Sequence, residues 1–239
     1  MLLIEKTDVY GWEAAIRGMR NPMNSWDKSD SGNCIDFKSC KDCPLWEACD
    51  DTTPDVTYIV GPNDHKLMMN LRNAGTDHRK FMRMIVVYVD ITAPLYWWKE
   101  FDTYKVGTVA NSCSTMHKIH AKEFTLEDFS CEKLLEIDGV TAAWDLDVFD
   151  DKLALELTIK MLNRYRDKFV FAKDKKYWDP MIQLLPSSYN QKRTVMLNYE
   201  VLANMYRARK NHKLDEWHTF CDWILGLPYS DIITVGVTH

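Results

Sequence analysis

Four cysteines that lie close together in the sequence could bind a metal ion. They are Cys34, Cys40, Cys43 and Cys49, in the pattern C-x5-C-x2-C-x5-C. Four thiolates can surround one ion tetrahedrally, and the central pair has the spacing of half a zinc knuckle. An iron–sulfur cluster also takes four cysteines, so the pattern predicts a metal centre without choosing between the two metals. Four free thiols in a polar surface loop are the alternative.

A second set of polar side chains follows a predicted strand and helix. Residues 85–93 are rich in β-branched and aromatic side chains, which favours a buried strand, and Pro94 suits the first turn of a helix. The polar segment 105–117 comes after that helix and contains Thr108 and Cys113. Polar side chains at such a junction are typical of a ligand crevice, with a solvated loop as the alternative. Cys113 would act as a nucleophile only if its pKa were depressed.

His78 and Arg209 are two further candidates for a binding site. His78 follows Gly75, which is expected to end a helix in the left-handed conformation. Arg209 belongs to the basic run 207–210. Each side chain also has a simpler interpretation, because a lone histidine is usually a surface or structural residue and an arginine at a helix C-terminus complements the helix dipole.

The elements that must position these residues follow from hydrophobic periodicity and turn signals. We expect a short strand at 56–60 and helices at 12–19, 63–73, 95–104, 126–137 and 152–171. Asn63 or Asp64 would cap the second of these helices. The aromatic side chains of the third helix are expected in the core. Arg17 and Arg20 precede an irregular loop, where we expect their charges to be solvated.

The composition indicates one globular domain of the α/β class. A chain of 239 residues and 28.0 kDa with 46% hydrophobic residues can bury a substantial core. We expect a mixed or antiparallel sheet flanked by helices, in a single domain over residues 1–239 with a cysteine-rich insertion near 31–55.

Charge and hydropathy exclude some classes of partner. The net charge of −5 and the pI near 5.8 give no general attraction to nucleic acid or to anionic membranes, although a local basic patch is compatible with them. There is no apolar run long enough to span a membrane, and charges within the first ten residues do not fit a signal peptide. The chain is therefore expected in the cytoplasm, where thiols stay reduced.

The stretch around Ala93-Pro94 resembles the core of the flavin-dependent thymidylate synthases. Their pattern is roughly G-H-E … A-P … Q-x-x-R-H-R-x-x-S-x-N-E-x-S-x-R-Y. Aligned without a gap, the family histidine falls on His78, its Arg-His-Arg on residues 103–105, and its two serines on Thr108 and Cys113. Lys105 keeps one positive charge where the family has two arginines.

A second stretch resembles the same family more closely. There a Leu-Pro pair precedes a helix with the pattern N-x-R-x-L-x-N and a later arginine, and the identical residues here are Asn198, Leu202, Asn204 and Arg209. Glu200 replaces the middle arginine, which reverses the charge. If residues 194–209 form one helix, then Asn198 and Arg209 share a face and lie about 16 Å apart, with Asn204 roughly 120° away.

The resemblance implies an enzyme of nucleotide biosynthesis. An FAD reduced by NADPH would pass a hydride to a carbon unit that methylenetetrahydrofolate donates to dUMP. Arg209 would hold the nucleotide phosphate and Thr108 would hydrogen-bond the nucleotide, while flavin or folate would be contacted by His78, Lys105, Asn198 and Asn204. Flavin chemistry does not require Cys113 as a nucleophile. The family is homotetrameric, which implies an oligomer.

The alternative function is a non-catalytic protein of the same fold. Such a protein would have lost the flavin and would use the cysteine array and aromatic side chains as a metal-stabilised module that binds a nucleotide or another macromolecule. The altered Arg-His-Arg motif favours this alternative, and the identical Asn198, Asn204 and Arg209 favour the enzyme.

Overall fold

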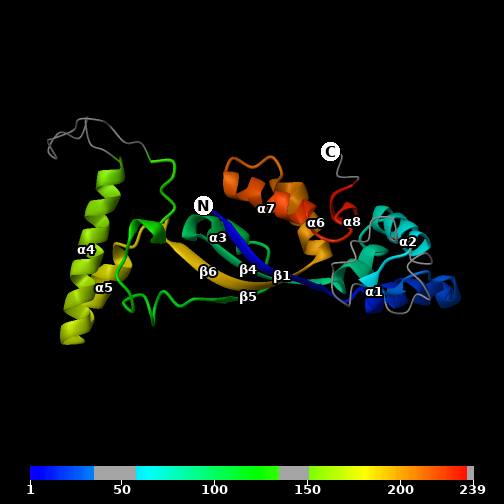
Figure 1. Ribbon diagram of the computed structural model, residues 1–239, viewed down its shortest axis with the longest axis horizontal. Coiled ribbons are helices and arrows are strands. Elements are labelled where there is room, and N and C mark those ends of the chain that lie inside the picture. The colour runs from blue at the N-terminus through cyan, green and yellow to red at the C-terminus, as the bar shows by residue number, and fades with distance from the viewer. Residues whose placement is uncertain (35–57, 135–150, 236–239) are drawn as a thin grey trace. The chain divides into compact units, whose positions relative to one another are not determined.

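The structure, a computed structural model that describes residues 1–34, 58–134 and 151–235, contains a four-stranded sheet (Figure 1). The strands follow the order β1-β4-β6-β5 and have these bounds: β1 Leu3–Tyr10, β4 Val86–Pro94, β5 Val109–Ser112 and β6 Asn190–Asn198. The N–H of Leu95 donates to the carbonyl of Tyr189, and the N–H of Tyr199 donates to the carbonyl of Ile85. The first bond joins the end of β4 to the start of β6, and the second joins the end of β6 to the start of β4. The two strands are therefore antiparallel. The expected α/β fold with a sheet flanked by helices is confirmed.

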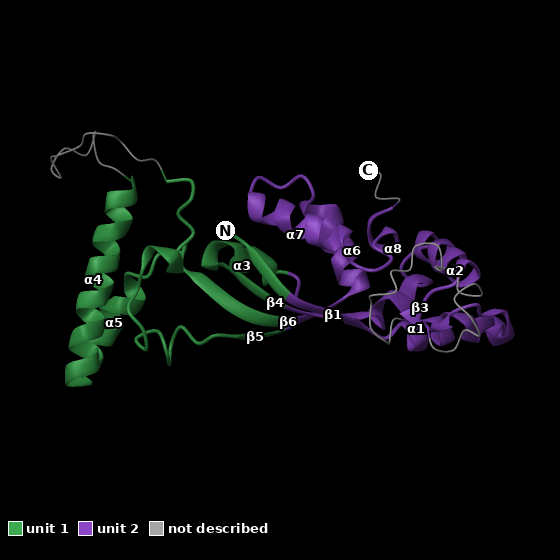
Figure 2. Cartoon of the chain, viewed as in Figure 1, with its two compact units in different colours: residues 1–5, 90–103, 110–194 green, residues 6–89, 104–109, 195–239 purple. Residues whose placement is uncertain are grey.

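The chain forms two compact units (Figure 2). Unit 1 comprises Met1–Glu5, Asp90–Thr103 and Ala110–Thr194, and unit 2 comprises Lys6–Val89, Tyr104–Val109 and Val195–His239. The expectation of a single domain with an insertion stays a prediction.

The predicted strand and helix around Pro94 are confirmed. In β4 the side chains of Val87, Val89 and Ile91 are buried, as the β-branched composition predicted. The helix that follows, α3 (Leu95–Phe101), buries Trp97 and Trp98. Its aromatic side chains therefore belong to the core, as expected.

The prediction of a helix that includes Thr194 and Asn198 is wrong. Residues 190–198 form strand β6, in which Gln191, Val195 and Leu197 are buried while their neighbours are more exposed. This alternation is the two-residue period of a strand. The helix, α6 (Tyr199–Arg209), begins only after Asn198.

The predicted helix at 126–137 is also wrong over its described part. Only one 3-10 turn forms, η7 (Leu126–Asp128), and a capping box between Thr125 and Asp128 closes it. Phe129 then becomes extended, bridges to Tyr189 and is buried in a hydrophobic cluster. Tertiary burial of Phe129 thus overrides the local helical preference.

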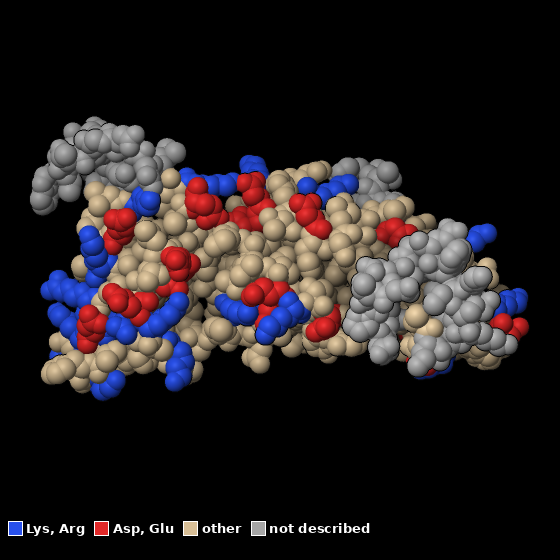
Figure 3. All heavy atoms as spheres, viewed as in Figure 1, with Lys and Arg blue, Asp and Glu red and all other residues tan. Residues whose placement is uncertain are grey.

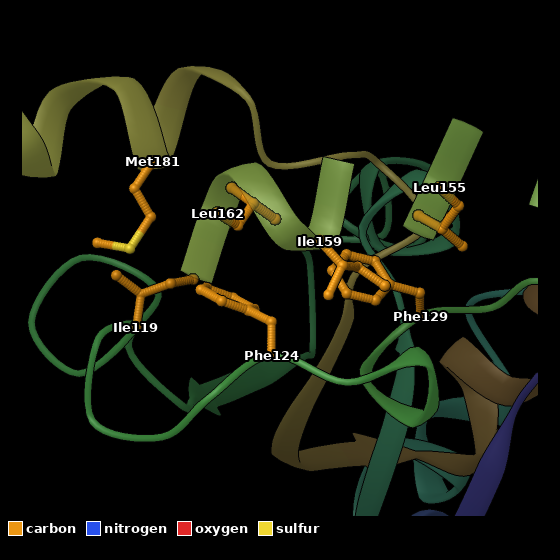
Figure 4. Packing of buried hydrophobic residues seen from close by; sticks show 7 residues of the cluster. All are labelled: Ile119, Phe124, Phe129, Leu155, Ile159, Leu162 and Met181. Atoms are coloured by element: carbon orange, nitrogen blue, oxygen red, sulfur yellow. The ribbon is translucent and has the colours of Figure 1, made fainter. Parts of the chain in front are cut away.

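Unit 1 also contains two packed helices, α4 (Asp151–Ala172) and α5 (Lys175–Gln183). The prediction of a helix at 152–171 is confirmed. Figure 4 shows the hydrophobic cluster that these helices form with residues of the segment 119–129, made of Ile119, Phe124, Phe129, Leu155, Ile159, Leu162 and Met181. On the face drawn in Figure 3, lysine and arginine side chains gather over α4 and α5, interspersed with carboxylates. This local basic patch contrasts with the negative net charge of the whole chain.

Unit 2 contains most of the remaining helices. They are α1 (Trp12–Arg20), η1 (Asn21–Met23), η2 (Trp26–Lys28), α2 (Pro62–Asn73), η6 (Arg79–Arg83), α7 (Asp215–Leu225) and α8 (Asp231–Thr234), with a small hairpin of β2 (Gly32–Asn33) and β3 (Tyr58–Ile59).

Gly61 is the N-cap of α2, so the prediction of Asn63 or Asp64 there is wrong. Gly75 follows α2 with φ +114°, which fits the predicted left-handed stop.

Most of the cysteine array falls outside the described residues. Cys34 is exposed at the end of the β2 region, whereas Cys40, Cys43 and Cys49 belong to the part of the chain that is not described. Among residues 1–34, 58–134 and 151–235 there is no cluster of three or more metal-ligating side chains. None of the helices in those ranges is long and apolar enough to cross a membrane.

Candidate functional site

Arg209, the last residue of α6, is held by two aromatic side chains. Its Nε donates a hydrogen bond of 2.9 Å to the Tyr104 hydroxyl, and its guanidinium carbon lies 4.8 Å from the centre of the Trp217 ring. The Tyr104 ring is 5.5 Å from the same carbon. Aromatic faces attract a guanidinium, and the C-terminal end of a helix also favours positive charge. The cation is therefore fixed in orientation at the end of α6.

Asn198 is the N-cap at the other end of α6. Its side-chain oxygen accepts a hydrogen bond of 3.0 Å from the N–H of Val201, and its Nδ2 donates one of 3.4 Å to the carbonyl of Gly107. Gly107 has φ +81°, and a Cβ added there would lie 2.7 Å from Asn198 Nδ2. Both the backbone conformation and the close approach favour glycine at this position.

The segment Tyr104–Val109 thus contacts both ends of α6, which are about 16 Å apart by helix rise. Thr108 lies on this segment, and its hydroxyl donates to the carbonyl of Tyr104. Lys105 is exposed beside it. The structure therefore links Thr108, Asn198 and Arg209 through one short stretch of chain within unit 2.

The other predicted site residues lie elsewhere. Asn204 is half-buried on α6 and accepts a hydrogen bond of 3.3 Å from Arg207, and His78 is exposed at the start of η6. Cys113 belongs to unit 1 and is exposed. Its N–H donates to the carbonyl of Lys192, and its carbonyl accepts from the side chain of Gln191, so its backbone is well fixed.

Glu200 carries an ion-pair network that sequence reasoning missed. This carboxylate, 7% exposed in the first turn of α6, accepts hydrogen bonds from Arg79, at 3.0 Å, and from Arg83. Burial would raise the pKa of Glu200, but the hydrogen bonds from Arg83 and Arg79 outweigh burial and lower that pKa. The charge reversal at this position is therefore matched by two arginines from η6, more than 110 residues earlier in the chain.

Arg20 and Asp64 form a second network, and the expectation that Arg20 is solvated is wrong. Arg20 is 4% exposed and its Nε lies 2.6 Å from a carboxylate oxygen of Asp64, which is fully buried. Ser29 and Ser31 also donate to Asp64. Arg17, in contrast, is exposed and pairs with Glu13. A contact between residues 44 positions apart has no local sequence signal.

Comparison of the whole chain with known proteins gives matches in structure only. No protein-family model matches the chain, and no curated protein matches its sequence. Thymidylate synthase X (ThyX) from Helicobacter pylori, solved with FAD and dUMP, superposes with a TM-score of 0.63 over 100% of both chains at 13% identity. The chain has the ThyX fold.

Two further structures support the ThyX fold. Another structure of the H. pylori flavin-dependent enzyme, also complexed with FAD and dUMP, has a TM-score of 0.59 at 13% identity and covers 97% of this chain and 95% of that one. The UMP/dUMP methylase PolB from Streptomyces cacaoi, bound with 5-Br dUMP, has a TM-score of 0.53 at 11% identity, with coverage of 94% and 88%. The resemblance seen in the sequence is therefore confirmed for the fold.

Proposed function

We propose that this chain is a divergent relative of the flavin-dependent thymidylate synthases that binds a pyrimidine deoxynucleotide such as dUMP and transfers a one-carbon unit to C5. The observation that carries the proposal is the link between Tyr104–Val109 and both ends of α6. Two residues identical to the family motif, Asn198 and Arg209, are bound there to the segment that contains Thr108.

Each residue has a proposed role that fits its chemistry. Arg209 would pair with the nucleotide phosphate, because a guanidinium matches phosphate oxygens in a fork of hydrogen bonds. Thr108 would hydrogen-bond the nucleotide, and Asn198, Asn204, His78 and Lys105 would contact flavin or folate. Cys113 stays a candidate catalytic side chain, and NADPH and methylenetetrahydrofolate stay the implied co-substrates.

The residues that align with the family Arg-His-Arg do not fit a flavin pyrophosphate. They are Thr103, whose hydroxyl donates to the carbonyl of Glu100 at 2.7 Å, Tyr104, whose hydroxyl accepts from Arg209, and Lys105. Lys105 provides one point charge, whereas two arginines would provide two bidentate forks. We therefore assign no chemical step to FAD.

The first test replaces Arg209 with alanine. We expect the affinity for dUMP, measured by calorimetry, to fall by about 1.5–3 kcal/mol, the range for hydrogen bonds to charged groups. Tyr104→Phe keeps the aromatic ring but removes the acceptor of the Arg209 Nε–H, and should cost about 0.5–1.5 kcal/mol. The exposed Arg17→Ala is the control. Equal affinities in all four proteins would exclude the role of Arg209.

The second candidate function is a nucleotide-binding protein that has kept the fold and lost the flavin, and the poor fit at Tyr104 and Lys105 favours it. FAD titration separates the two candidates. A yellow protein that binds FAD and transfers a labelled carbon to dUMP would support the enzyme. A colourless protein that binds dUMP but not FAD would support the binding protein.

We also propose that the chain forms a homo-oligomer and acts in the cytoplasm. The oligomer rests on the tetramer that the resemblance implies. Light scattering on the purified protein would test it, and a monomeric mass at micromolar concentration would count against it.

A further inference from the structure

Unit 2 contains a cavity of about 980 Å³ to which none of the proposed nucleotide-binding residues contributes. Residues 7–14 form one wall, from the end of β1 and the start of α1. Trp223 and residues 226–229, between α7 and α8, form another. Asn33 and Tyr58 of the small hairpin complete the lining. A concave site of this size can enclose a small organic molecule.

Five aromatic residues line the cavity, namely Tyr10, Trp12, Tyr58, Trp223 and Tyr229. Several of them are fixed by contacts. The indole N–H of Trp223 donates to Thr7 at 3.0 Å, and the Tyr229 hydroxyl accepts from the N–H of Val60 at 2.9 Å. The Trp12 and Tyr229 rings meet edge to face at 5.1 Å. The walls are thus preorganised, so a ligand would lose little free energy in ordering them.

The backbone at Tyr229 gives independent support for a functional role. Its φ is +50°, in the left-handed region that residues other than glycine seldom occupy. Such strain persists only where the surrounding structure holds it and is frequent in ligand sites. Tyr229 is one of the residues that line the cavity.

The charge of the lining selects the class of ligand. Asp8 and Glu13 are exposed acidic residues of the lining, and the described lining residues include no lysine, arginine or histidine. Glu13 already pairs with Arg17, so Asp8 is the main source of negative charge. Carboxylates disfavour a phosphate, whereas aromatic faces with a nearby carboxylate attract a cation.

We propose that this cavity binds an organic cation, with the positive charge against the aromatic faces and Asp8 as its counter-ion. The site is separate from the nucleotide-binding residues and does not depend on the proposed function. It adds to the chain a ligand class, an organic ammonium or a cationic heteroaromatic ring, that the nucleotide site would not accept.

The experiment compares a cation with a neutral molecule of nearly the same shape. Calorimetry with N-methylquinolinium and with quinoline at pH 8 should show the cation binding at least about 5-fold more tightly, the ratio that one cation–π contact supplies. Asp8→Asn should weaken the cation by about 3–5-fold and leave quinoline unchanged. Tyr10 is 58% exposed, so Tyr10→Leu should weaken the cation without unfolding the protein, and Tyr10→Phe should not weaken it.

The matched control is Asp27→Asn, which removes an exposed carboxylate of the same unit that does not line the cavity. The proposal is overturned if quinoline binds as tightly as the cation, if neither binds at millimolar concentration, or if Asp27→Asn and Asp8→Asn have equal effects. A thermal midpoint within a few degrees of the parent protein confirms that each variant is folded.

Discussion

Asp64 shows how a single buried carboxylate can fix a loop. It receives hydrogen bonds from Arg20, Ser29 and Ser31, and so connects α2 to the C-terminal residue of α1 and to the chain that follows η2. The Arg20 guanidinium also donates to the carbonyls of Ser25 and Lys28. The loop after α1 is therefore held by the Arg20–Asp64 ion pair together with the hydrogen bonds that Ser29 and Ser31 donate to Asp64.

Replacing Asp64 with asparagine should strongly destabilise the protein. The substitution leaves the buried charge of Arg20 without its counter-ion, which costs about 3–5 kcal/mol. Chemical denaturation at pH 7 would measure the change. Glu13→Gln breaks the exposed pair with Arg17 and should change the unfolding free energy by no more than about 0.5 kcal/mol.

The same pair predicts a dependence on pH. Burial would raise the pKa of Asp64, but hydrogen bonds from Ser29, Ser31 and Arg20 lower that pKa below its ordinary value of 3.8. A carboxyl with a lowered folded pKa stabilises the fold above its unfolded pKa, and the stabilisation is lost as the pH falls through the folded pKa. The difference between the parent protein and Asp64→Asn should therefore be constant near neutral pH and shrink below about pH 4. A constant difference down to pH 2 would contradict this assignment.

Glu200 should behave as a shared counter-ion. Glu200→Gln leaves Arg79 and Arg83 close together without a carboxylate, and we expect a loss of about 1–3 kcal/mol in unfolding free energy. Arg83→Gln should cost less, because Arg79 still pairs with Glu200. In the double variant the two effects should not add, and a double-mutant cycle would measure the coupling.

The conformation of the segment Tyr104–Val109, and its contact with the start of α6, depend on Gly107. Gly107→Ala would introduce both an unfavourable positive φ and a clash with Asn198, whereas Gly75→Ala would introduce only the unfavourable φ, because no atom lies within 4 Å of the added Cβ. We expect Gly107→Ala to lower the thermal midpoint more than Gly75→Ala and to weaken dUMP binding, which the control should leave unchanged. Equal effects on the thermal midpoint and on dUMP affinity would show that the close approach to Asn198 contributes to neither.

The elements that the sequence predicted well are those with a strong local signal. The strand β4 and the helices α1 and α4 follow directly from composition and periodicity. Strand β6 was missed because the family resemblance suggested one continuous helix, although Val195 and Leu197 already alternate with less apolar residues. The ion pairs of Asp64 and Glu200 join distant segments, and no local pattern could reveal them. Of the candidate site, Thr108, Asn198 and Arg209 were found through motif spacing, while the roles of Tyr104 and Gly107 appeared only in the structure.

For the molecule as a whole, the cysteine array predicts one metal ion or one iron–sulfur cluster per chain. Elemental analysis of the purified protein should find zinc or iron. A chelator should lower the thermal midpoint, since metal binding contributes directly to the stability of such loops. Cys40→Ser should abolish the bound metal, and Cys221→Ser, at a buried cysteine of α7, is the control. Metal-free protein in which all four array cysteines react with a thiol reagent would contradict the prediction.

Each strand of the four-stranded sheet has residues in both units, and this limits how the protein can be divided and how it unfolds. The chain passes from one unit to the other at 5–6, 89–90, 103–104, 109–110 and 194–195, and four of these five crossings fall inside or at the edge of a sheet strand. No single cut yields either unit as one uninterrupted fragment, so either half of the chain expressed alone should be insoluble. Because the strands of the sheet have residues in both units, the two units should unfold together. Calorimetry should therefore record one endotherm rather than two.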